Sequence, residues 1–169
     1  MKLWIIYKDG IGFSRIIAEM LQDRLDDYID VYVGNANKID PVFLVEEKVD
    51  YIFIGDSRSK VIPILEIQNW LLKFSEISKK KNLIIKAISS YYISLDDTPI
   101  ILSGLKFLQN NINTEIIYPP ILCLKFNLVE LVLENGANDI IKDYSNEFIE
   151  FLIKSNKELK KGGKKDGRN

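Results

Sequence analysis

Short, unbroken apolar runs are the feature that most constrains how this chain folds. Leu3 to Tyr7 are five consecutive apolar residues, Tyr51 to Ile54 is a run of the same kind, and Leu83 to Ile88 is apolar except for Lys86. A strand with one face in water would alternate polar and apolar residues, so these runs indicate parallel strands that are covered on both faces. Ile29 to Val33 is a further short strand, and Glu115 to Tyr118 opens a fifth.

Helical patterns separate the strands. Apolar residues recur at helical spacing in four stretches, which begin after Phe13 and near Ile62, Thr98 and Asp139. This alternation predicts an α/β fold, a doubly wound five-stranded parallel sheet with helices on both faces. Pro119-Pro120 interrupts the fifth strand, so Ile121 to Leu124 are either its continuation or a separate edge segment.

Ligands of such sheets bind beyond the carboxyl ends of the strands. The loops expected to matter are therefore residues 8–13, 56–61 and 89–97 and the stretch around Pro119.

The composition excludes several kinds of catalyst. The chain has no histidine and a single cysteine, Cys123. Imidazole bases, Ser-His and Cys-His pairs, histidine-containing zinc sites and cysteine-bound iron–sulfur clusters are therefore absent from the chain. Any chemistry must use carboxylates, lysines, hydroxyls, backbone groups or a borrowed cofactor.

Charge is unevenly distributed along the chain. Residues 154–169 hold seven basic and two acidic side chains, whereas residues 1–153 hold 16 and 22. We expect a single domain over residues 1–153 and a basic, disordered tail over 154–169 that serves solubility or a weak polyanion contact. The acidic body argues against binding to DNA or RNA. With no signal peptide and no membrane-spanning run expected, the sequence indicates a cytoplasmic protein.

Three segments give the chain a resemblance to the flavodoxin family that extends over nearly all of residues 2–153. They are Ile5-Ile6-Tyr7 with the loop and helix that end at Glu19, the strand Val49 to Gly55, and Asn82 to Tyr91. The resemblance implies the strand order 2-1-3-4-5 and non-covalent binding of flavin mononucleotide (FMN).

The phosphate loop of that family follows the pattern (Ser/Thr)-x-Thr-Gly-x-Thr. The aligned residues here are Asp9, Gly10, Ile11, Gly12, Phe13 and Ser14. Gly12 and Ser14 match the pattern, while Ile11 lacks a hydroxyl donor and Asp9 places a carboxylate near the expected phosphate. At ~5 Å and an effective dielectric of about 20, one unit of like charge costs roughly 3 kcal/mol.

The loops that would hold the flavin ring follow the third and fourth strands. The resemblance assigns Asp56, Ser57 and Arg58 to the first, and Ser90, Tyr91 and Tyr92 to the second, where an aromatic residue would stack on the ring.

We therefore expect an electron carrier or binding domain, rather than a self-contained catalyst, that acts with a protein partner carrying a basic surface. One alternative is a flavodoxin-like scaffold that has lost FMN and serves as an interaction module. A less favoured alternative is a phosphoacceptor receiver domain, for which Asp9, Asp56 and Ser89 fill three positions but the second acidic residue and the lysine are missing.

Overall fold

A computed structural model describes residues 1–8, 12–56, 65–94, 112–118, 121–127, 130 and 132–162. In chain order its elements are β1 (Lys2–Lys8), α1 (Phe13–Leu25), β2 (Asp30–Asn35), α2 (Pro41–Glu46), β3 (Tyr51–Asp56), α3 (Leu65–Lys80), β4 (Ile85–Ser94), β5 (Thr114–Ile117), β6 (Ile121–Asn127), β7 (Val132–Leu133) and α5 (Ala137–Gly162). The helix expected from Thr98 lies outside the described residues.

The strands form one sheet in the order β2-β1-β3-β4-β6-β7, and β5 also pairs with β4. All pairings are parallel except that of β6 with β7. The predicted doubly wound parallel sheet is confirmed, but five is the wrong number of strands. The fifth position of the sheet is shared by β5 and β6, which follow one another along β4 on either side of Pro119-Pro120, and β7 adds a short antiparallel edge.

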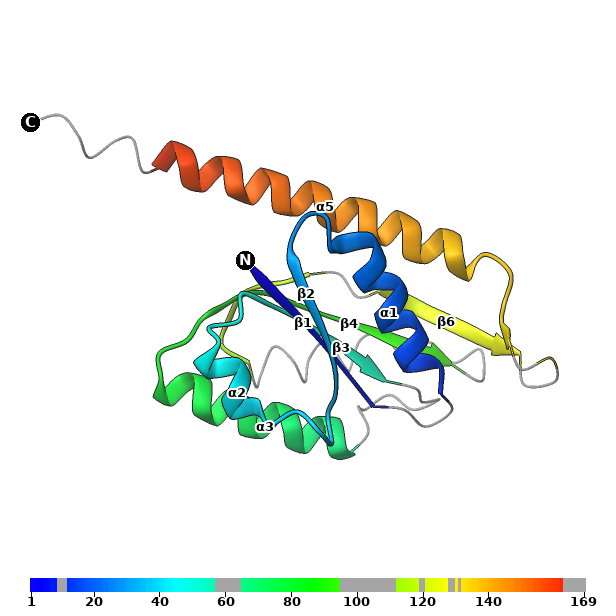
Figure 1. Ribbon diagram of the computed structural model, residues 1–169, viewed down its shortest axis with the longest axis horizontal. Helices are drawn as coiled ribbons and strands as arrows, with labels where there is room; N and C mark the ends of the chain where they lie inside the picture. The colour runs from blue at the N-terminus through cyan, green and yellow to red at the C-terminus, as the bar shows by residue number, and fades with distance from the viewer. Residues whose placement is uncertain are drawn as a thin grey trace, which may run out of the picture.

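Both faces of the sheet are covered, as the unbroken apolar runs predicted. In β1, Leu3 and Ile5 belong to the core beneath α1 and α5, while Trp4 and Ile6 belong to the core beneath α2 and α3. Figure 1 shows these two helix layers on opposite sides of the strands. The alternation arises because successive side chains of a strand point to opposite faces.

Two element boundaries differ from the sequence prediction. The loop expected over residues 89–97 is strand as far as Ser94, so Ser90, Tyr91 and Tyr92 lie within β4. The last helix continues to Gly162, so residues 154–162, expected to be disordered, are helical. The distal part of α5 extends past the sheet (Figure 1).

Candidate functional site

The carboxyl ends of β1, β3 and β4 meet at one edge of the sheet, where α1 begins. The register places Tyr7 of β1 beside Gly55 of β3, and Gly55 beside Tyr91 of β4. This row of three residues forms the base of the candidate site.

The first turn of α1 has unused hydrogen-bonding capacity. Gly12 is its N-cap, with a φ of 88° in the left-handed region, and has no side chain to accept from the first N–H groups of the helix. Ser14 is fully buried, and its Oγ has no hydrogen-bond partner among the described residues. The first turn also contains no acidic residue. A helix N-terminus beside a buried, unpaired hydroxyl is suited to an anion.

Tyr91 holds this turn against the sheet. Its hydroxyl donates a hydrogen bond of 2.6 Å to the backbone oxygen of Ser14, and its ring covers the backbone of Gly55. A Cβ placed on Gly55 would lie 2.1 Å from Oη of Tyr91, so only glycine leaves room for the ring. Tyr91 is therefore a positioning residue for the first turn of α1, a role that the sequence alone did not indicate.

The expected stacking surface is not exposed. Tyr91 is 0% exposed and Tyr92 4% exposed, so neither ring offers a free face in this structure. Both were expected in a loop, but both belong to β4, which places them inside the sheet layer. Their contact with a flavin ring stays a prediction.

The remaining predicted residues fall into two groups. Asp9, Gly10, Ile11, Ser57 and Arg58 lie outside the described residues. Phe13 begins α1 and packs against the core beneath α1 and α5; Asp56 ends β3; and Ser90 is buried in β4 with an Oγ that has no described hydrogen-bond partner.

Lys8 is the last residue of β1, so its charge lies near the candidate site. Its Nζ lies 3.7 Å from Oε1 of Glu66 on α3, so its charge is partly neutralised on the α2 and α3 side of the sheet. Glu66 was not identified from the sequence, because no local pattern links residues from β1 and α3.

Ser89, the hydroxyl residue of the receiver alternative, contacts the last helix. Its Oγ accepts a hydrogen bond of 2.5 Å from the hydroxyl of Tyr144, and both residues are buried. Burial raises the pKa of Tyr144, so its hydroxyl remains a donor. Ser89 is thus engaged by α5, and the described residues contain no group of three side chains able to hold a metal ion.

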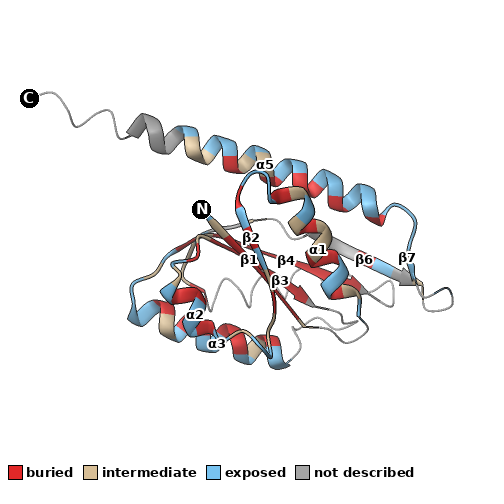
Figure 2. Cartoon of the chain, in the orientation of Figure 1, coloured by how far each residue is buried: buried red, intermediate tan, exposed pale blue. Residues whose placement is uncertain are grey.

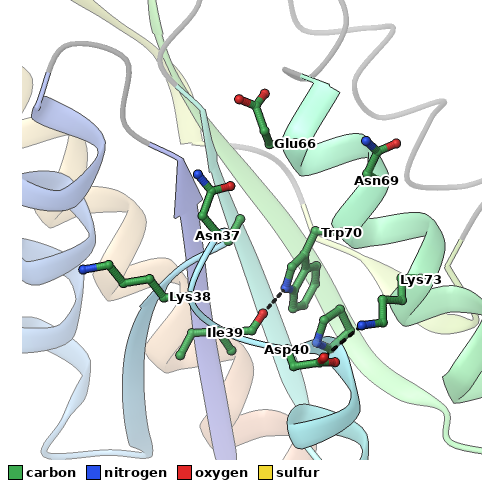
Figure 3. A pocket seen from close by; sticks show the side chains of 10 residues that line it. Asn37, Lys38, Ile39, Asp40, Glu66, Asn69, Trp70 and Lys73 are labelled. Atoms are coloured by element: carbon green, nitrogen blue, oxygen red, sulfur yellow. Dashed lines mark hydrogen bonds and ion pairs between the residues drawn. The ribbon is translucent and has the colours of Figure 1, made fainter.

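Two cavities lie near the helices. One, of about 470 Å³, lies between the segment after β2 and α3. Two contacts join its walls (Figure 3): Nε1 of Trp70 donates a hydrogen bond to the Ile39 oxygen at 2.7 Å, and Lys73 forms an ion pair with Asp40 at 2.9 Å. The other, of about 520 Å³, adjoins the first turn of α1 and is lined by Phe13, Ile16 and residues 132–139. The second cavity shares Phe13 with the first turn of α1, and the first cavity is lined by Glu66, the partner of Lys8.

The strand order and the two helix layers define a doubly wound α/β domain, and the candidate site after β1 lies at its switch point. Within that class the fold is flavodoxin-like. The structure superposes on an archaeal flavodoxin with a TM-score of 0.64 at 16% identity, covering 90% of this chain and 99% of the other. Flavodoxin 2 of Bacillus cereus gives a TM-score of 0.64 at 14% identity, covering 92% and 99%.

A larger protein contains the same fold. The rubredoxin oxygen:oxidoreductase of Desulfovibrio gigas matches with a TM-score of 0.63 at 12% identity, and the match covers 89% of this chain but 36% of that one. The present chain thus corresponds to about a third of that enzyme. No family model and no curated protein matches the sequence. Among the described residues, no helix combines the length and the apolar composition needed to cross a membrane.

Proposed function

We propose that this protein binds FMN non-covalently at the first turn of α1 and transfers electrons to or from a protein partner. The observation that carries the proposal is the buried Oγ of Ser14, which has no described partner although it lies beside the N-cap Gly12. A buried hydroxyl without a hydrogen bond costs about 1–3 kcal/mol, and a phosphate oxygen would satisfy it. The residues present therefore fit the phosphate end of the cofactor, which would reach the Ser14 hydroxyl by displacing the groups that bury it.

The chain would bind and orient the cofactor rather than carry out chemistry itself. N–H groups of the first turn and the Ser14 hydroxyl would hold the phosphate, while Tyr91 would fix the turn through the Ser14 oxygen. The flavin, when bound, would supply the redox chemistry that a chain without histidine lacks. The net negative charge of residues 1–153 supports a partner with a basic surface.

A second candidate function is supported by the buried tyrosines. Because Tyr91 and Tyr92 offer no exposed ring face, the domain is also suited to a scaffold that does not retain the flavin.

The variant Ser14→Ala tests FMN binding against the scaffold function. In the absence of ligand, Ser14→Ala removes an unsatisfied hydroxyl, so the free energy of unfolding should stay unchanged or rise. FMN affinity should fall about tenfold or more, because a hydrogen bond to a charged phosphate is lost. Both quantities are measurable, by urea unfolding and by titration of flavin fluorescence.

The matched control is Ser145→Ala. Ser145 is also buried, but its hydroxyl donates to the Ile141 oxygen at 2.7 Å within α5, away from the first turn of α1. Its removal should leave FMN affinity unchanged. A wild-type protein whose melting temperature does not move with excess FMN would refute the proposal and leave the scaffold.

A further inference from the structure

The outer side of α5 carries a row of charges sorted by sign. Asp139, Asp143, Glu147 and Glu150 are followed by Lys154 and Lys157, all of them exposed. Successive members are three or four residues apart, so they form one stripe along the helix. Figure 2 shows exposed residues along the outer side of α5 and buried ones toward the sheet.

The helix dipole alone does not explain this order. The dipole favours acidic residues in the first turn and basic residues in the last, and its effect fades within that turn. Asp143, Glu147 and Glu150 lie beyond the first turn of α5, and Lys154 lies two turns before its end at Gly162. The described contact within the stripe is the pair of Lys154 with Glu150 at 3.6 Å, both largely exposed, and such a pair contributes little.

The stripe is self-complementary when two copies of α5 run antiparallel. A two-fold axis near Glu150 brings Lys154 of one copy opposite Glu147 of the other, and Lys157 opposite Asp143, and the symmetry repeats each pair. The two Glu150 side chains face each other at the axis, and their repulsion offsets part of this attraction. Exposed Ile153, 43% accessible, flanks the stripe and adds apolar contact. The two sheets would lie on opposite sides of the helix pair, because each body packs on the inner face of its own α5 (Figure 1).

We propose that the outer face of α5 is a dimerisation surface whose partner is a second copy of this chain, paired antiparallel through its segregated charges. A contact built mainly on exposed ion pairs gives a weak dimer, whose population rises with protein concentration. Because the charges are exposed, the dimer weakens as salt is added. The inference is independent of the flavin, which would bind at the carboxyl edge of the sheet.

Charge-swapped variants test the pairing. Asp143→Lys with Glu147→Lys makes the stripe largely basic, and Lys154→Glu with Lys157→Glu makes it acidic. Neither double variant should dimerise alone, because like charges would face each other across the two-fold axis. An equimolar mixture of the two should form a heterodimer at least as tight as the wild-type dimer. Sedimentation equilibrium at low salt and at about 0.5 M salt measures all of these states.

The control is Lys79→Glu with Lys80→Glu, two exposed lysines at the end of α3, which should leave the dimer intact. A wild-type protein that remains monomeric at millimolar concentration and low salt would overturn the proposal, as would a mixture that fails to restore association. A monomer that instead binds heparin through Lys154 and Lys157 would assign this end of α5 to a polyanion.

Discussion

Gly55→Ala tests whether close packing of Tyr91 on β3 organises the candidate site. A methyl group on Gly55 would lie 2.1 Å from Oη, 2.2 Å from Cζ and 2.7 Å from Cε2 of Tyr91, and that ring is fully buried. Overpacking of this kind costs about 1–3 kcal/mol, while loss of glycine freedom in the unfolded chain returns about 0.4–1 kcal/mol. Since two ring atoms and the hydroxyl oxygen of Tyr91 are overlapped, we expect a net destabilisation of about 2 kcal/mol, or about 4–8 °C in Tm.

The assay is urea unfolding followed by circular dichroism, with the same substitution made in two backgrounds. In Tyr91→Leu the ring is absent, so Gly55→Ala should cost less than about 0.5 kcal/mol, and the coupling energy should exceed about 1 kcal/mol. In Tyr91→Phe the Cζ and Cε2 contacts remain, so the cost should persist. Equal costs in the wild-type and leucine backgrounds would refute the packing argument.

Three further predictions concern single groups. Tyr144→Phe removes the donor to Ser89 and should lower the unfolding free energy by about 1–2 kcal/mol in urea. Burial, aided by nearby carboxylates, raises the pKa of Tyr51 from 10.0 to about 12. The neutral side chain therefore contributes its full stability below pH 10, and this contribution is lost as the pH rises to 12. Urea unfolding between these pH values should show a smaller loss for Tyr51→Phe than for the wild type. Gly12→Ala and Gly136→Ala, at φ of 88° and 91°, should each cost about 1 kcal/mol in urea unfolding, but only Gly12→Ala should reduce FMN affinity in a fluorescence titration.

The sheet was predictable from the sequence because its signal is local. Unbroken runs such as Leu3 to Tyr7 indicate strands buried on both sides, and the cores on the two faces bear this out. The end of β4 was not predictable in the same way. Ser89 and Ser90 resemble loop residues, yet Ser89 is satisfied by Tyr144, which lies 55 residues away in the chain.

The place of the candidate site in the fold could be predicted from the sequence, but the packing around it could not. Gly12 and Ser14 identified the turn after β1, and the structure places both at the start of α1. Tyr91 was expected to stack on the flavin ring because the resemblance to flavodoxins places an aromatic residue at this position. Its burial depends on the missing side chain of Gly55 in the neighbouring strand, a pairing that is set by sheet register.

The buried tyrosines and the unpaired Ser14 hydroxyl make it possible to test recognition of the phosphate and recognition of the flavin ring separately. If the Ser14 hydroxyl and the helix N-terminus supply most of the affinity, riboflavin, which lacks the phosphate, should bind at least 100-fold more weakly than FMN. Inorganic phosphate should then compete with FMN in a fluorescence titration. If instead β4 rearranges so that Tyr91 or Tyr92 stacks on the ring, riboflavin should retain much of the affinity, since base–aromatic stacking alone contributes about 1–3 kcal/mol. Comparable affinities for FMN and riboflavin would contradict a site organised around the first turn of α1.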